Sequence, residues 1–191
     1  MTRDFTDEPV AAASLDRILY AGRRAPSAGN SQGTDFLVLE GPVQTARYWD
    51  VTLPVEQRGG FRWPGLLRAP VLIVPFADAG AYLARYAEPD KAISGLGESE
   101  SRWPVPYWTV DTAFAAMAMQ LAAVDEGLGY LFFGIFLHES ELLEVFGVPP
   151  ELRPIGTIAV GHPAAGAGTK AGRSAGRPRR AADVVVHRGR W

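Results

Sequence analysis

One segment near the middle of the chain constrains the fold more than any other: TVDTAFAAMAMQLAAVDEGLG, residues 109–129. Small or apolar residues cover almost its whole circumference, and the residues at the helical period are Ala113, Ala116, Met117, Gln120, Leu121 and Val124. Thr109 or Asp111 is placed to cap its start, and Gly127 to end it. We therefore predict a helix over Thr109–Glu126 that is buried on most of its sides.

Short apolar runs bounded by proline or glycine predict the strands of a sheet. These runs are Phe36–Glu40, Ala69–Ala77, Gly129–Phe136, Pro154–Pro163 and Asp183–Trp191. Between them, further helices are predicted at Ala11–Arg23, Pro42–Val51, Ala79–Ala87 and His138–Gly147. A sheet this apolar needs cover on both faces, so the pattern predicts an α/β or α+β domain.

Composition limits the function classes. The 191 residues fit one domain, residues 1–191, and 47% are hydrophobic, which is enough for a core. The net charge of -2 argues against nucleic acid or an anionic membrane as a partner. The chain has no Cys, which excludes a disulfide framework, a thiolate nucleophile and a zinc–thiolate site. Its three His are scattered without the spacing of metal ligands, so we expect no metal site.

The sequence also predicts where the protein is located. The start, MTRDFTDEPV, has no apolar core of signal-peptide length. No run reaches the about 18 apolar residues of a membrane span. We expect a soluble, cytoplasmic protein.

The stretch RRAPSAGNSQ, residues 23–32, concentrates hydrogen-bonding groups between the first helix and the first strand. A turn of this kind needs little more than one Gly or one Asn. Its arginines offer forked donors to an anion, while Ser27 and Asn30 can bond the nitrogens and oxygens of a heterocycle. Gly29 lets a ligand approach the backbone closely. The alternative, a plain polar turn at a helix end, has about equal weight on composition alone.

The segment Glu88–Trp108 has three prolines, two glycines and no period, yet it carries Trp103, Tyr107 and Trp108 near its end. Long loops of this kind are often lids or binding loops. We predict a mobile lid, residues 88–108, whose aromatic rings cover a flat ligand. The alternative is that these rings form a small satellite core.

Two further features have a functional and a plain interpretation. Gly134 lies between bulky residues, which indicates a place where something approaches the backbone closely, although GYLFFGIF is also a normal core strand. Arginines crowd the C-terminal end, where they can bind a phosphate or form a solvated basic tail. They are Arg173, Arg177, Arg179, Arg180, Arg188 and Arg190.

The sequence shows no side-chain machinery for catalysis. No Ser lies in a nucleophile-elbow pattern, and neither a GxGxxG nor a Walker loop is present. A polar cradle and an aromatic cover without acid/base groups suit an enzyme whose cofactor carries the chemistry.

The chain resembles the nitroreductase family of FMN enzymes over nearly its whole length. The resemblance lies in segments that follow the family's order: TRDFTDEPV, RRAPSAGNSQ, RAPVLIVPFA, WTVDTAFAAMAMQLAAVDEGLGYLFFGIF, LRPIGTIAVGHP and RPRRAADVVVHRGRW. It implies an α+β sandwich with a mostly antiparallel sheet flanked by helices. It also implies a homodimer in which the C-terminal arm, residues 163–191, is exchanged between subunits.

The resemblance assigns cofactor-binding roles to particular residues. The segment that reaches the flavin ring from the partner subunit corresponds to Pro26, Ser27, Ala28 and Asn30. The segment that faces the flavin near its reactive nitrogen corresponds to Phe133, Gly134 and Ile135. The residues that bind the FMN phosphate correspond to Arg177 and Arg179, and Arg3 corresponds to a residue that binds the same part of FMN. Arg62 lies where a contact to the flavin pyrimidine is expected.

The activity that this resemblance implies is hydride transfer from NADH or NADPH to FMN, and then to a nitroaromatic, a quinone or a related conjugated acceptor. No side chain is expected to act as a nucleophile. Two alternatives stay open: a flavin-binding protein without catalysis, and an interaction protein that keeps the fold without the cofactor.

Overall fold

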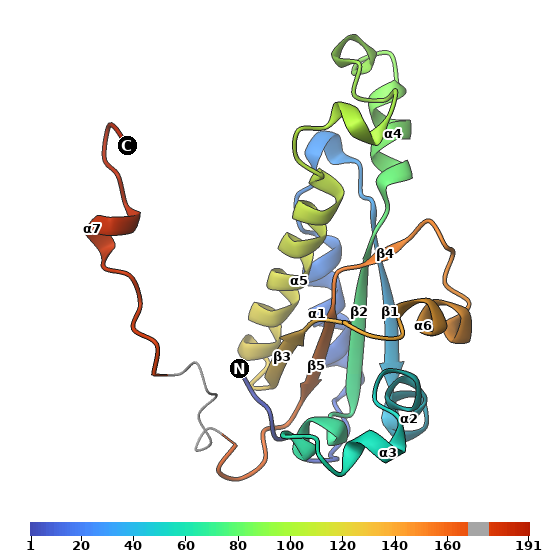
Figure 1. The fold of residues 1–191 in the computed structure, drawn as a ribbon, viewed down its shortest axis with the longest axis vertical. Helices are drawn as coiled ribbons and strands as arrows, with labels where there is room; N and C mark the ends of the chain where they lie inside the picture. Colours follow the sequence, from blue (N-terminus) through green and yellow to red (C-terminus); the bar gives the residue numbers. More distant parts are fainter. Residues whose placement is uncertain (168–175) are drawn as a thin grey trace.

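An antiparallel sheet with helices on both faces forms the body of the molecule in the computed structural model, which describes residues 1–167 and 176–191 (Figure 1). Its strands are β1 (Thr34–Glu40), β2 (Val71–Ala77), β3 (Gly129–Phe133), β4 (Arg153–Pro154) and β5 (Thr157–Gly161). Their order is β1-β2-β5-β3, and β4 extends the pairing at one end of β2. All of the described pairs are antiparallel, as the sequence predicts.

The helices follow the predicted positions closely, with several short additions. The α-helices are α1 (Ala12–Arg23), α2 (Gly41–Thr52), α3 (Val55–Arg58), α4 (Ala79–Ala87), α5 (Tyr107–Asp125), α6 (Glu139–Phe146) and α7 (Ala182–Val185). Short 3₁₀ helices occur at η1 (Ala28–Asn30), η2 (Pro64–Arg68), η3 (Ala92–Ser94) and η4 (Glu100–Arg102). No helix among these is long and apolar enough to cross a membrane.

The period-2 alternation of β2 explains the layers. Val71 and Ile73 pack into a core with α1 and α5, while Leu72 and Val74 pack on the other face with α2 and α6. Side chains of both sets are buried, so the sheet has cover on both faces. This confirms the expectation drawn from its continuous apolar runs.

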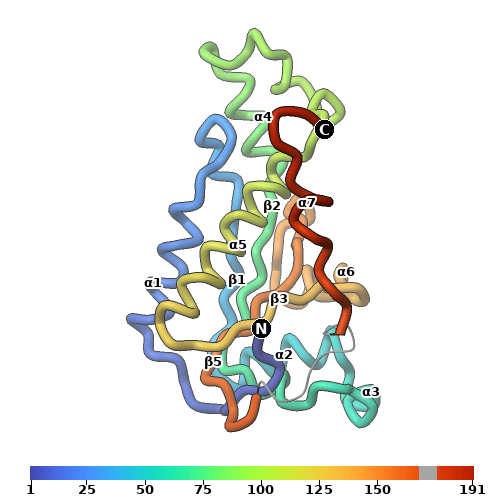
Figure 2. Tube along the Cα trace, turned by 90° about the vertical axis from the view of Figure 1, so that its left-hand side faces the viewer, coloured from blue at the N-terminus to red at the C-terminus, as the bar shows by residue number. Residues whose placement is uncertain are grey.

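Helices α1 and α5 lie side by side on one face (Figure 2). Their approach depends on Gly22, because a Cβ at this position would lie 2.8 Å from Cγ of Met119. At the other end of α5, Gly127 adopts φ +72° and ends the helix as predicted.

One expectation for α5 is wrong, and a second is not tested by a single chain. The helix begins at Tyr107, after Pro106, whose φ of -73° suits a helix start. Asp111 therefore lies one turn inside the helix and does not cap it. Within a single chain, Phe114, Met117 and other apolar residues on its outer face are exposed, so burial of the helix on most sides stays a prediction.

Two strand predictions also need correction. The strand expected over Gly129–Phe136 ends at Phe133, since its partner β5 begins opposite it at Thr157. The strand expected over Pro154–Pro163 is split into β4 and β5. Between them, Gly156 has φ +146°, and a Cβ there would meet the Phe132 ring and the backbone of Phe133.

The last strand, predicted over Asp183–Trp191, is wrong: the short helix α7 occupies Ala182–Val185, and no strand follows it. No strand of the described chain lies beside this segment to pair with it. Its backbone groups are instead satisfied locally, as in the 2.8 Å bond from the Val186 N–H to the Ala182 carbonyl.

We predict that the free-energy costs of removing the two hydroxyls of one buried hydrogen bond between α2 and β5 are not additive. The hydroxyls of Tyr48 and Thr157 lie 2.7 Å apart and are both buried. Thr157→Val leaves the Tyr48 hydroxyl unpaired and should cost about 1–3 kcal/mol in urea unfolding. The double variant Tyr48→Phe/Thr157→Val should cost clearly less than the sum of the two single changes. Strictly additive costs would contradict this account.

Candidate functional site

The N-terminal segment holds Arg3 in a defined place. The Phe5 ring is fully buried, and the Phe5 N–H donates to the Gly65 carbonyl at 3.1 Å. Position 65 must lack a side chain, because a Cβ there would overlap the carboxylate of Asp4. The chain therefore runs close against η2, and Arg3 extends toward Trp63.

Arg3 and Arg62 meet on one aromatic ring. Their guanidinium carbons lie 5.2 Å and 4.9 Å from the centre of the Trp63 ring, within the range of cation–π contacts. In the part of the chain that the structure describes, neither forms an ion pair with a carboxylate. The structure thus brings together two of the predicted cofactor-binding cations, which are distant in sequence.

A mostly apolar cavity of about 290 Å³ lies where β3 ends. Phe133, Gly134 and Ile135 line it, so the segment predicted to face the flavin does border a cavity. We call this space the Gly134 cavity. A Cβ at Gly134 would lie 2.6 Å from the ring of Phe136, so a side chain at position 134 would require this exposed ring to move.

Trp49 forms one wall of the Gly134 cavity. Its ring stacks on Phe133, with centroids 5.7 Å apart and planes 11° from parallel. Its Nε1 is buried and has no hydrogen-bond partner within the described residues. Phe61 lines the same cavity and immediately precedes Arg62, so the cavity and the pair of cations are neighbours along the chain.

The second group of predicted residues lies in the Ser27 loop, which we define as residues 26–32. Hydrogen bonds hold this loop in place: the Gln32 N–H donates to Oγ of Ser27 at 3.0 Å, and the Ala28 N–H donates to Asp111 at 2.7 Å. The side chains of Pro26 and Asn30 are exposed. The loop is therefore a helix-end turn, but one anchored by contacts from distant elements.

Backbone strain is concentrated near these two groups. Within the described residues, the non-glycine residues with positive φ are Asn30 (55°), Gln32 (53°) and His138 (60°). The first two belong to the Ser27 loop, and His138 follows the segment that lines the Gly134 cavity. Such conformations cost energy and persist where surrounding contacts enforce them, often at functional sites.

A single chain does not bring the predicted groups together. Pro26 and Ser27 line a separate cavity of about 380 Å³, the Ser27 cavity, which shares no lining residue with the Gly134 cavity. Arg177 and Arg179 are exposed on the C-terminal segment, which stands apart from the body in Figure 1. Arg173 lies outside the described residues.

Comparison with known proteins identifies the family of this chain. The Nitroreductase family model matches residues 1–162. The chain belongs to the nitroreductase family. The resemblance seen in the sequence is thereby confirmed, and the cavities described above are those of a nitroreductase-family chain.

Individual relatives agree with this assignment. The chain is 29% identical over 186 residues to FMN reductase [NAD(P)H] of Bacillus subtilis (strain 168), covering 97% of this chain and 68% of that protein. It is 30% identical over 155 residues to the putative NAD(P)H nitroreductase YdjA of Escherichia coli (strain K12), covering 78% and 75% of the two chains. The solved structure of the hypothetical oxidoreductase YcnD from Bacillus subtilis matches with a TM-score of 0.71 at 29% identity, covering 100% of this chain and 70% of that one.

Two of the three aromatic residues predicted for the lid are core residues in this structure. Trp103 and Trp108 are buried against Tyr82, with ring centroids 5.8 Å and 6.2 Å from its ring. They form the satellite core that was the alternative interpretation. Tyr107 is 40% exposed, so a ligand contact by this ring stays a prediction. The mobility of residues 88–108 stays a prediction as well.

Sequence reasoning did not identify Trp49, Trp63 or Asp111 as site residues. Trp49 and Trp63 had no usable signal, because their positions depend on contacts between distant segments. Asp111 did have such a signal: it is a carboxylate within the apolar helix α5, where burial without partners is costly.

We predict that Gly29 in the Ser27 loop tolerates no side chain. Its φ is +63°, and a Cβ would lie 2.9 Å from the Tyr86 ring. Gly29→Ala should therefore add a steric clash to the about 1–2 kcal/mol cost of a left-handed residue. Gly127→Ala is the matched control, since Gly127 has φ +72° with no atom within 4 Å of its Cβ. Urea unfolding that shows equal losses for both variants would rule out the clash.

Proposed function

We propose that this chain is an FMN-dependent oxidoreductase that takes hydride from NADH or NADPH and passes it to a small conjugated acceptor, such as a nitroaromatic or a quinone. The observation that carries the proposal is the pairing of Arg3 and Arg62 on the Trp63 ring. Arg62 is next in the chain to Phe61, which lines the Gly134 cavity. The names of its relatives, FMN reductase [NAD(P)H] and NAD(P)H nitroreductase, support the same chemistry.

The residues present fit a bound flavin. The Gly134 cavity offers flat aromatic walls and one position without a side chain, which suits a planar ring. Guanidinium groups of Arg3 and Arg62 are available for carbonyl or phosphate oxygens. The Gly134 cavity, with a volume of about 290 Å³, is slightly smaller than most ligand pockets, which span about 300–1,000 Å³. Further walls are therefore needed, and a second subunit can supply them.

When bound, FMN supplies the hydride chemistry. The chain's part is to bind, to orient and to exclude water. Trp49 and Phe133 provide stacked apolar surface, and Arg3 and Arg62 provide positive charge at the edge of the site. Burial raises the pKa of Tyr48, a cavity residue, to about 12, so its hydroxyl stays neutral at physiological pH. This side chain therefore carries its proton and is not available as a base.

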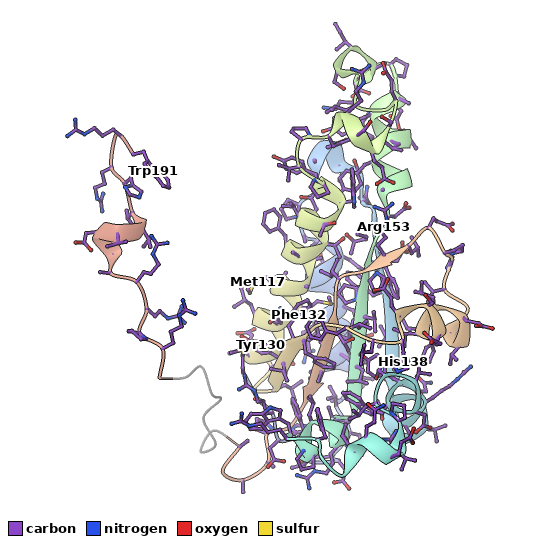
Figure 3. The ribbon with its side chains drawn as sticks, in the orientation of Figure 1. Met117, Tyr130, Phe132, His138, Arg153 and Trp191 are labelled. Atoms are coloured by element: carbon purple, nitrogen blue, oxygen red, sulfur yellow. The ribbon has the colours of Figure 1, made fainter. Side chains whose placement is uncertain are left out.

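A second copy of the chain is proposed as the missing wall. Phe114, Met117, Leu121 and Val124 form a stripe on the outer face of α5, with exposed fractions between 51% and 62%. Figure 3 shows Met117 on the side of α5 that faces away from the sheet. Their spacing of three and four residues matches a helix–helix seam. An apolar stripe of this length favours a two-fold contact between identical chains.

In such a dimer, the Ser27 loop of one subunit would complete the Gly134 cavity of the other. The exposed C-terminal segment, with Val184 and Val186 about half exposed, would pack on the partner and bring Arg177 and Arg179 to the FMN phosphate. Ala116 is buried within its own chain and is therefore not available for this contact. Ala113, which is exposed, remains available for the close approach.

The absorbance spectrum of the purified protein, with and without added FMN, tests the proposed function. We expect a yellow protein whose flavin is bleached by NADH or NADPH under anaerobic conditions. The double variant Arg177→Ala/Arg179→Ala should bind FMN about ten-fold or more weakly, since it loses charge-assisted bonds of about 1.5–3 kcal/mol. A flavin that neither nicotinamide reduces would indicate a non-catalytic binding protein. A protein that takes up no FMN would indicate an interaction protein.

We further predict that Leu121→Glu converts the dimer into monomers at micromolar concentration, because it places a charge in the centre of the proposed seam. Val43→Glu on α2 is the control, since Val43 is 82% exposed and lies outside the stripe. Sedimentation velocity separates the two states. A monomeric wild-type protein that retains FMN would refute the dimer and the shared site.

A further inference from the structure

Asp111 is a buried carboxylate without an ion pair in the part of the chain that the structure describes. It is 5% exposed, on the inner side of α5. Its Oδ2 accepts two hydrogen bonds of 2.7 Å, from the Ala28 N–H and from the Tyr82 hydroxyl. A buried carboxylate is costly unless its donors compensate for lost water, so these two contacts are the reason it is tolerated there.

The two donors come from separate parts of the fold. Ala28 belongs to the Ser27 loop, and Tyr82 belongs to α4. One oxygen atom of Asp111 therefore ties the loop to α4 and α5 at once. Because Ala28 directly precedes Gly29 and Asn30, the bond fixes the backbone just before these two residues with positive φ.

Arg85 holds the next residue of the loop. Its Nε donates to the Gly29 carbonyl at 2.9 Å. Two successive residues of the loop are thus held by side chains. Asp111 accepts a hydrogen bond from the Ala28 N–H, and Arg85 donates one to the Gly29 carbonyl. The two anchors lie on different helices, α5 and α4, so the loop has support from both.

The remaining nitrogens of Arg85 contact the start of the segment 88–108. Nη1 and Nη2 donate to the two carboxylate oxygens of Asp90 at 2.7 Å and 2.8 Å, and Nη1 also donates to Glu88 at 3.0 Å. Farther along this segment, Trp103 packs on Tyr86, one residue after Arg85, with ring centroids 4.7 Å apart. A single guanidinium therefore joins the Ser27 loop to the segment predicted to form the lid.

We propose that Asp111 is the positioning residue of the Ser27 loop, and that Arg85 couples this loop to residues 88–108. The inference rests on the proposed function for the role of the loop beside the flavin, while the contacts themselves lie within one chain. Asp111 also lines the Ser27 cavity, but its Oδ2 already accepts two hydrogen bonds from the protein, so we assign it a positioning role. It acts by holding Ala28, and with it the strained backbone at Asn30, in the geometry that the partner's cavity requires.

Three variants separate positioning from general stability. Asp111→Ala removes the acceptor. Asp111→Asn retains an oxygen that can accept both bonds, and its amide nitrogen takes the place of Oδ1, for which no hydrogen bond is found within the described chain. Thr112→Val is the matched control: Thr112 is the next residue on α5, fully buried, and its hydroxyl pairs with Thr34 at 2.9 Å.

Hydrogen–deuterium exchange on the full-length protein without FMN measures the loop directly, and FMN titration measures its effect. In Asp111→Ala we expect amides of residues 26–32 to exchange about ten-fold faster, with residues 71–77 of β2 unchanged, and FMN affinity to fall about ten-fold. Asp111→Asn should restore both properties to within about three-fold, and Thr112→Val should leave loop exchange unchanged. Loop exchange in Asp111→Ala equal to wild type, or equal to that in Thr112→Val, would overturn the proposal.

The same data distinguish this inference from the proposed function. If the wild-type protein binds no FMN but Asp111→Ala still releases the loop, the positioning role stands and the flavin function fails. If FMN binds and neither loop exchange nor affinity responds, the function stands and the positioning role fails. Should Asp111→Ala not fold, Arg85→Gln replaces it, because that change removes the bond to Gly29 from a side chain near the surface.

Asp90→Asn tests the coupling through Arg85. It removes one carboxylate oxygen from the Arg85 pair while leaving the bond to Gly29 in place. We expect faster exchange in both residues 88–108 and residues 26–32. Faster exchange in residues 88–108 alone would overturn the coupling and leave the role of Asp111 intact.

Discussion

Strand β2 is buried along its whole length, and the arrangement of the molecule follows from the need to cover both of its faces. All seven of its residues, Val71–Ala77, are buried. Alternate side chains belong to different cores, one against α1 and α5 and the other against α2 and α6. Burial of this kind is stable only when helices lie on both sides, so the layered structure follows from a single apolar run.

The candidate site lies where this regular arrangement stops. Gly134 follows the last paired residue of β3, and the Ser27 loop follows the end of α1. Backbone amides and carbonyls are free for ligands only outside ladders and helices, so both places are suited to bind a flavin. The cost is local strain, which appears at Asn30 and Gln32, and the contacts to Asp111 and Arg85 offset it.

Helix α5 connects stability with function. Its inner side packs on the sheet and carries Asp111, which holds the Ser27 loop. Its outer side carries the apolar stripe that the proposed dimer would bury. The same helix would therefore set the position of the loop within one subunit and the position of that subunit beside the other. A change in α5 would then affect the site along both routes.

The sequence by itself determined the types of most elements and the need for cover on both faces of the sheet, and its resemblance to a known family implied the antiparallel arrangement. These depend on local periodicity, on turn residues such as Gly127 and on segment order, all of which can be read along the chain. The tertiary structure decided what the individual polar and aromatic groups do. Asp111, expected as a helix cap, became the anchor of a distant loop, and Trp103 and Trp108, expected over a ligand, became core. The strand expected at Asp183–Trp191 is a helical turn. Each outcome depends on which groups from other segments come within contact distance, and only the folded chain decides that.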